Sequence, residues 1–142
     1  MTRRESREAA LKILYALEYN DDTLNAVVEN LTAEKKLNVS DFTMQIVRTY
    51  LDHRQEVDKR IVEHLHNWDY QRVAVIDKIL LRMAVTEFTY FDTIPPQVTI
   101  NEMIEIGKNY STERSGKFIN GILDAIHHKK HSRKKKKTKK KN

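Results

Sequence analysis

The first residues suited to chemistry are the arginines of the segment RRESRE, close to the start of the chain. Arg3 and Arg7 are four residues apart, so they share one face of a helix, and Arg4 lies beside them. A guanidinium group offers a planar fork of donors that fits phosphate oxygens and base edges. The segment therefore indicates an RNA contact. A second interpretation stays open, in which Glu8 pairs with Arg4 or Lys12 and the segment is an ordinary solvated helix face.

A second group of candidates lies in the segment GKFINGILD, residues 116–124. Here Lys117 precedes Phe118, and Lys108 and Tyr110 form a similar basic and aromatic pair a few residues earlier. A basic side chain can hold a phosphate while the neighbouring ring stacks on an unpaired base. The segment thus predicts a contact with single-stranded RNA. The alternative is that Phe118 is a core residue, since it begins the apolar stripe of the last expected helix.

Patterns that carry catalysis or metal binding are missing from the sequence. The chain has no cysteine, which excludes disulfides, thiolate nucleophiles and cysteine zinc sites. It also lacks a P-loop, a G-x-G-x-x-G segment and an H-E-x-x-H motif. The histidine spacing does not favour a metal site. We therefore expect no catalytic residue, no metal and no cofactor, and we expect that the protein is not an enzyme.

The positive net charge is concentrated at the C-terminal end. Residues 127–142 hold nine Lys, one Arg and no acidic residue, whereas the whole chain has 26 basic and 20 acidic residues. Residues 1–126 thus hold 16 basic and 20 acidic residues, a balance of −4 against +10 in the final segment. Such a segment repels itself and has nothing apolar to bury. We predict one folded domain over residues 1–128 and a disordered basic tail over residues 129–142.

Helices must position these candidate residues, because apolar side chains recur at helical spacing through most of the chain. Only three Gly and two Pro occur, and so few turn residues disfavour a fold of many short strands. We expect a capping box of Thr2 and Glu5 at the first helix and a cap by Asn38 or Ser40 at the third. The expected helices cover residues 3–17, 23–36, 41–66, 72–90, 97–110 and 115–127. The polar stretch 52–56 is either an exposed part of one long helix or a break between two.

Targeting and membrane signals are also missing from the sequence pattern. The N-terminal segment MTRRESREAA is charged and has no apolar region of a secretory signal. No apolar run approaches the roughly 20 residues that a membrane-spanning helix needs. We therefore expect a cytoplasmic protein without a membrane partner.

Taken together, three segments resemble the NusB family: RRESREAALKILYALEY, VIDKILLRMAVTEFTYFDTIPPQVTINEMIEIGKNYS and GKFINGILDAI. The resemblance covers nearly all of residues 3–126, although residues 21–70 match only in pattern. It implies an all-α fold of two perpendicular three-helix bundles. It also implies binding to the boxA element of ribosomal RNA leader transcripts, a heterodimer with the ribosomal protein NusE, and action on RNA polymerase with other Nus factors.

The resemblance also assigns roles to individual residues. It implies RNA contacts for one set of positions: Arg3, Arg4, Arg7, Tyr110, Lys117 and Phe118. For Asp77 and Glu87 it implies partner contacts, and buried or capping roles compete with that interpretation. Two positions depart from the family pattern, since Arg114 replaces a frequent acidic residue and Gly116 replaces a common His. We expect the positive charge of Arg114 to strengthen phosphate attraction near Lys117.

Three further possibilities stay open. The tail could act by itself as a nucleic-acid chaperone in ribosomal RNA biogenesis, because its attraction to polyanions needs no sequence recognition. The domain could alternatively be the accessory part of a ribosomal RNA methyltransferase, an enzyme that also needs a cofactor-binding domain. A homodimer of the free protein is possible as well.

Overall fold

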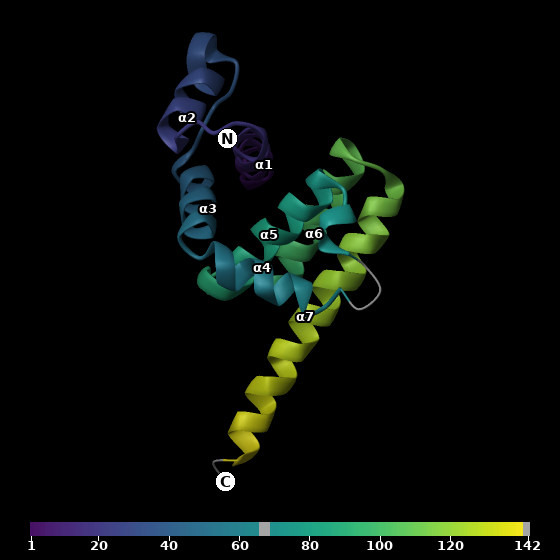
Figure 1. Cartoon of the computed structure of the whole chain (residues 1–142). Helices are drawn as coiled ribbons and strands as arrows, with labels where there is room; N and C mark the ends of the chain where they lie inside the picture. The colour runs from purple at the N-terminus through teal and green to yellow at the C-terminus, as the bar shows by residue number, and fades with distance from the viewer. Residues whose placement is uncertain (66–68, 141–142) are drawn as a thin grey trace.

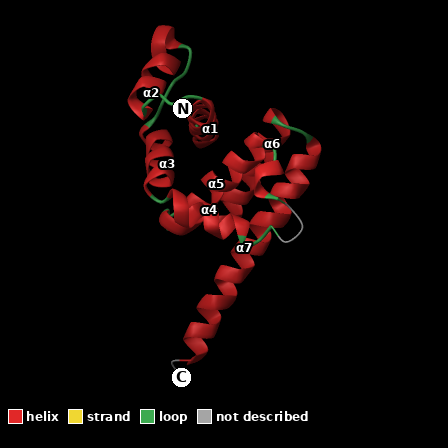
Figure 2. Cartoon of the chain, in the orientation of Figure 1, coloured by secondary structure: helices red, strands yellow, loops and turns green. Residues whose placement is uncertain are grey.

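The computed structural model describes residues 1–65 and 69–140, and it describes side chains as far as His128. The regular elements in this part of the chain are all helices, which loops connect, and it contains no strand (Figure 2). The elements in chain order are α1 (Arg3–Tyr19), α2 (Leu24–Thr32), the 3₁₀-helix η1 (Ala33–Lys35), α3 (Asp41–Asp52), α4 (Arg54–Val62), the 3₁₀-helix η2 (Tyr70–Arg72), α5 (Val75–Tyr90), α6 (Pro96–Tyr110) and α7 (Glu113–Lys140). The prediction of an all-α fold is confirmed.

The helices form two groups that meet at α5. Helix α1 packs against α2 and α3, while α6 packs against α7 and α5, and α4 lies across α5 (Figure 1). Helix α5 also contacts α1 and α3, so it belongs to the interface between the groups. Its segment from Ile79 to Phe88 is buried on every side, as expected for a central helix that is apolar over most of its surface.

The helix starts agree with the caps that the sequence predicts. The Thr2 hydroxyl accepts a hydrogen bond from the Glu5 backbone N–H at 3.1 Å, and the Glu5 carboxylate accepts one from the Thr2 backbone N–H at 3.1 Å. Ser40, rather than Asn38, caps α3, because its side chain accepts from the Thr43 backbone N–H. The polar stretch 52–56 is a break, since α3 ends at Asp52 and α4 begins at Arg54. Residue 66, the predicted end of this long helix, lies outside the described residues.

Other predicted helix limits were also wrong. The second helix ends at Thr32 instead of residue 36, because Glu34 and Lys35 adopt a left-handed backbone with φ of 58°. The central helix begins at Val75 instead of residue 72, because Tyr70–Arg72 forms a separate 3₁₀ turn. The last helix begins at Glu113 instead of residue 115, and it continues to Lys140 instead of ending at residue 127. The backbone of the predicted tail is helical as far as Lys140, and none of the side chains of residues 129–142 is described. The predicted disorder of this tail stays a prediction.

Close packing of α6 against α7 brings the two C-terminal motifs together. A Cβ atom at Gly107 would lie only 3.0 Å from Cδ1 of Ile119 on α7, so the absence of a side chain allows the helices to approach. Gly116 is also buried, and a Cβ there would lie 3.4 Å from Cγ2 of Ile104. This contact places the ends of α6 and the start of α7 on one surface.

A membrane-spanning segment is not found in this fold. Among the described residues, no helix combines the length and the apolar character that crossing a bilayer needs.

Candidate nucleic-acid interface

The three N-terminal arginines point to three different environments. Arg7 is buried, with 2% of its surface exposed. Its Nε and Nη2 donate to the two carboxylate oxygens of Glu87 at 2.9 and 2.8 Å, in a side-by-side arrangement. Glu87 is 1% exposed and also accepts from the Thr99 hydroxyl at 2.9 Å. This ion pair joins α1, α5 and α6 inside the protein.

The burial of Arg7 corrects the expectation that its donor fork faces a phosphate. Arg3 and Arg7 lie on the same face of α1, but only Arg3 is exposed to solvent, because α1 passes from the surface into the contact with α5 and α6. Glu87 likewise takes the buried role that competed with partner binding. Arg7 and Glu87 hold the surrounding helices together from inside the protein, and neither presents its charged group at the surface.

Arg3 and Arg4 remain exposed beside the buried pair. The guanidinium carbon of Arg3 lies 4.0 Å from the ring centroid of Phe42, a cation–π contact that leaves one face of the guanidinium open. Arg4 donates to both carboxylate oxygens of Glu102 at 2.7 and 3.1 Å. This contact holds the pKa of the Glu102 carboxyl below its ordinary value, because Arg4 hydrogen-bonds to the charged form. The arginines border a groove of about 780 Å³, which Ile94, Pro95 and Val98 also line.

A cavity of about 590 Å³ lies where the starts of α5 and α7 meet. Three exposed cations line it: Arg72 from η2, and Arg114 and Lys117 from α7. None of these cations forms an ion pair within the described part of the chain. Phe118 is half-buried, lines the same cavity and also packs against the core, as the second interpretation of this residue predicts. The cavity therefore combines positive charge with an aromatic ring.

The base of the cavity is fixed by a buried hydrogen bond. The Ser115 hydroxyl donates to Oδ1 of Asp77 at 2.6 Å, and both residues are buried and line the cavity. The bond ties the first turn of α5 to the first turn of α7. Asp77 consequently has a buried, element-joining role, which was the alternative to its predicted partner contact.

Tyr110 lies between the cavity and the N-terminal helix. Its hydroxyl donates to the Glu8 carboxylate at 3.1 Å, and the Lys12 ammonium lies 5.8 Å from its ring centroid. Burial raises the pKa of the Tyr110 phenol above its ordinary value, so the hydroxyl is protonated at neutral pH. The next residue, Ser111, lines the cavity. Tyr110, at the end of α6, therefore lies between the cavity and its contact with α1. The structure thus brings Tyr110, Lys117 and Phe118 into one region, with Arg3 and Arg4 farther along α1.

Sequence reasoning missed Arg72, whose only signal was its place beside the expected start of the central helix. It also treated Arg114 as a family departure, although the residue belongs to the cavity rim. Over the described ranges, no group of three or more His, Asp or Glu side chains could hold a metal ion. The described site therefore supplies positive charge and ring surfaces, the features with which proteins bind a phosphate-bearing polymer.

These features define an all-helical binding protein with a cationic, partly aromatic surface, and comparison with known proteins gives its family. The NusB family model matches residues 4–128, and the chain belongs to the NusB family. Relatives that carry the name transcription antitermination protein NusB include proteins from two organisms. The one from Chloroherpeton thalassium is 41% identical over 130 residues, which cover 89% of this chain and 62% of that protein. The one from Salinibacter ruber is 43% identical over 129 residues, covering 88% and 80%.

Solved structures confirm the predicted arrangement of two perpendicular three-helix bundles. NusB from T. maritima superposes with a TM-score of 0.78 at 35% identity, covering 89% of this chain and 90% of that one. A chain in the crystal structure of the antitermination factors NusB and NusE with double-stranded RNA has a TM-score of 0.78 at 26% identity, covering 89% and 96%. The family consists of non-enzymatic antitermination factors, so the prediction that this chain is not an enzyme is confirmed.

Proposed function

We propose that this chain is an RNA-binding transcription antitermination factor of the cytoplasm. It holds boxA RNA of ribosomal RNA leader transcripts together with NusE, keeps the transcript close to RNA polymerase and other Nus factors, and helps the polymerase to read through terminators. The observation that carries the proposal is the cavity in which Arg72, Arg114 and Lys117 surround Phe118. A relative that forms a complex with NusE and double-stranded RNA supports it.

RNA recognition at this surface divides between charge and stacking. Arg72, Arg114 and Lys117 hold phosphates at the rim, because exposed cations replace the counterions of the RNA backbone. Phe118 and Tyr110 offer ring surfaces to unpaired bases, which is how proteins read single-stranded RNA. Arg3 and Arg4 extend the positive surface along α1. Arg7 acts indirectly, since its bond to Glu87 fixes the helix that carries both arginines.

The contact of Arg3 with Phe42 gives a prediction for this extension. Replacing Phe42 by Leu keeps the site apolar but removes the ring that holds the Arg3 guanidinium. Because an exposed cation–π contact contributes about 0.5–1 kcal/mol, we expect RNA affinity to fall by about two- to fivefold. Titration of a labelled boxA RNA would measure it. In an Arg3→Ala background the Phe42 substitution should change nothing further, and an equal loss in both backgrounds would contradict a role through Arg3.

A tail-driven chaperone is the second candidate function, favoured by the +10 charge of residues 127–142. Its attraction to RNA would be independent of sequence and sensitive to salt. The two functions differ in which part of the chain they need, because the cavity lies within residues 72–122 and the tail begins at residue 129.

Fluorescence anisotropy of boxA RNA and a scrambled control, at two salt concentrations, tests the proposal. The full chain and a shortened chain ending at Lys129 are each measured with and without NusE. We expect the shortened chain to prefer boxA and NusE to tighten that preference. If all binding disappears with the tail and never separates the two RNAs, the chain is a tail-driven polyanion binder and the proposed function is wrong.

A further inference from the structure

A short turn presents Arg72 to the cavity. The 3₁₀-helix η2 (Tyr70–Arg72) is closed by hydrogen bonds from the Gln71 backbone N–H to the Asp69 carboxylate at 3.1 Å and from the Arg72 N–H to the Asp69 carbonyl at 2.9 Å. Gln71 and Arg72 are exposed, whereas Tyr70 and Val73 contact the core. The position of Arg72 therefore depends on the two anchors on either side of it in sequence.

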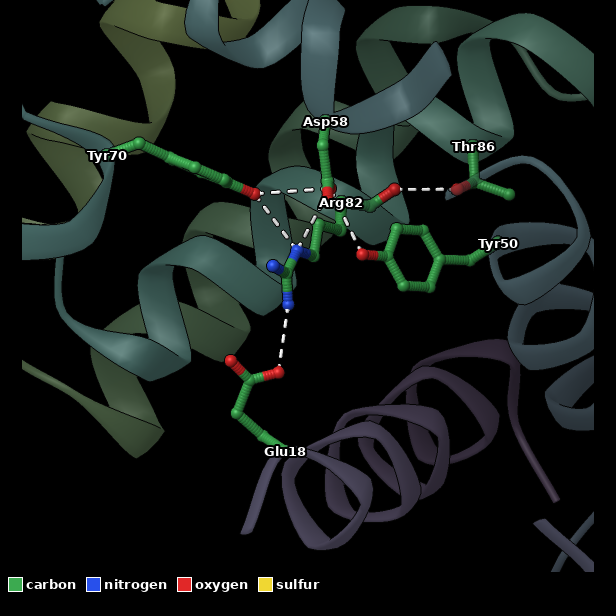
Figure 3. Close-up of polar contacts among 6 residues, drawn as sticks. All are labelled: Glu18, Tyr50, Asp58, Tyr70, Arg82 and Thr86. Atoms are coloured by element: carbon green, nitrogen blue, oxygen red, sulfur yellow. Dashed lines mark hydrogen bonds and ion pairs between the residues drawn. The ribbon is translucent and has the colours of Figure 1, made fainter. Parts of the chain in front are cut away.

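Tyr70 is anchored by a polar cluster around the buried Arg82 (Figure 3). The Nε of Arg82 lies 2.9 Å from the Tyr70 hydroxyl and 3.1 Å from Oδ1 of Asp58. The Tyr70 hydroxyl in turn donates to the same Asp58 oxygen at 3.2 Å. Burial raises the pKa of the Tyr70 phenol above its ordinary value, so the hydroxyl keeps the proton that it donates.

The rest of the cluster is fixed from three other helices. Nη1 of Arg82 donates to Glu18 of α1 at 3.2 Å, and the backbone carbonyl of Arg82 accepts from the Thr86 hydroxyl at 2.7 Å within α5. Asp58 comes from α4, and Tyr50 of α3 reaches it as well. Figure 3 shows the side chains of Tyr70, Tyr50 and Glu18 approaching the Arg82–Asp58 pair from different directions. Tyr70 thereby binds η2 to a framework that includes both groups of helices.

We propose that Tyr70 is a positioning residue for RNA binding, whose hydroxyl, held by Arg82 and Asp58, keeps the η2 turn in place and Arg72 at the cavity rim. The inference rests on the proposed function, since it assigns a support to one of the phosphate-binding cations. A fixed guanidinium loses less freedom when it binds a phosphate than a mobile one does. Loosening the turn should therefore weaken RNA binding although Arg72 itself is unchanged.

The chain offers a matched control in Tyr50. Its hydroxyl donates to the same oxygen of Asp58, at 3.0 Å, and its ring also lies near the Arg82 guanidinium. Tyr50 belongs to α3, however, and does not line the cavity. Tyr50→Phe and Tyr70→Phe thus each remove a hydrogen bond to the same Asp58 oxygen, and Tyr70→Phe also removes the bond that Arg82 Nε donates to the Tyr70 hydroxyl. Only Tyr70→Phe is expected to release the turn.

Five full-length variants test the inference: Tyr70→Phe, Tyr50→Phe, Arg72→Ala, Lys117→Ala and the double variant Tyr70→Phe with Arg72→Ala. We expect Tyr70→Phe to weaken binding of boxA RNA by about two- to tenfold, the low end of the range for coupled neighbours, and Tyr50→Phe to bind like the wild type. In the Arg72→Ala background, Tyr70→Phe should have no further effect. Mass spectrometry of limited trypsin digests should show faster cleavage after Arg72 in Tyr70→Phe only.

Each contrary outcome is distinguishable. If Arg72→Ala weakens binding while Tyr70→Phe binds and is cleaved like the wild type, Tyr70 does not position Arg72 and the RNA site still stands. If Tyr50→Phe weakens binding as much as Tyr70→Phe, the effect is general loss of stability and the inference is wrong. If Arg72→Ala and Lys117→Ala both bind RNA like the wild type, the cavity is not the RNA site. The proposed function and the inference are then both wrong.

Discussion

Replacing Glu87 by Gln is expected to lower the free energy of unfolding by about 3–5 kcal/mol, the usual effect of removing one partner from a buried ion pair. The guanidinium of Arg7 would keep its full charge inside the protein, where 2% of the residue is exposed, without a carboxylate to balance it. The Thr99 hydroxyl would also lose a charged acceptor. Urea unfolding followed by circular dichroism would measure the change, and an unaltered m-value would show that the denatured state is unaffected.

The exposed pair of Arg4 on α1 and Glu102 on α6 is a matched control. It has the same chemical groups as the buried pair, and its arginine also donates to both carboxylate oxygens. The side chains of Arg4 and Glu102 are 45% and 23% exposed, so Glu102→Gln should cost less than about 1 kcal/mol. The lowered pKa of Glu102 means that this small contribution is present at neutral pH and is lost as the pH falls through the folded-state pKa. Equal losses in the Glu87 and Glu102 variants would refute a special role for the buried pair.

The fold was largely predictable from local patterns. Thr2 with Glu5, and Ser40, cap helices because a short side-chain oxygen needs only a backbone N–H three residues away. The ends of the helices were less predictable where no local rule applies. The left-handed backbone at Glu34 and Lys35 involves residue types that give no turn signal, and periodicity could not decide whether the stretch 52–56 bends at His53.

Local sequence patterns could not predict which residues pair over long distances in the sequence. Periodicity correctly put Arg3 and Arg7 on one face of α1, but the partner of Arg7 lies 80 residues away on α5. A chain with 20 acidic residues offers many possible partners. Burial of Asp77 and Glu87 also depends on the packing of α5 against neighbouring helices, which sequence spacing does not show.

The candidate site was found in part for a related reason. Lys117 and Phe118 were recognisable because they are adjacent in sequence. Arg72 reaches the same cavity from another element, through a turn whose position depends on Tyr70 and on a cluster of residues from α1, α3, α4 and α5. A cation without an adjacent aromatic residue has no sequence pattern that separates it from an ordinary surface arginine.

The other large expected effect concerns the charge at the cavity rim. Replacing Arg114 by Asp should weaken binding of boxA RNA by about tenfold or more, because it removes a charge-assisted contact and adds repulsion next to Lys117. The slope of log affinity against log salt should also fall by about 0.7 for each phosphate contact that is lost from a single strand. Anisotropy titrations over a range of salt concentrations, with the chain ending at Lys129, would measure both quantities without the charge of most of the tail.

Arg48→Asp separates a local effect from a change of net charge. Arg48 is exposed on α3 and is not part of the cavity lining, and its replacement changes the net charge by the same two units. If the rim acts locally, the Arg48 variant should lose at most about twofold in affinity and keep the salt slope of the unsubstituted chain. Similar losses in both variants would mean that RNA responds to the overall field of the protein. In that case Arg114, despite its place beside Lys117, would contribute no specific contact.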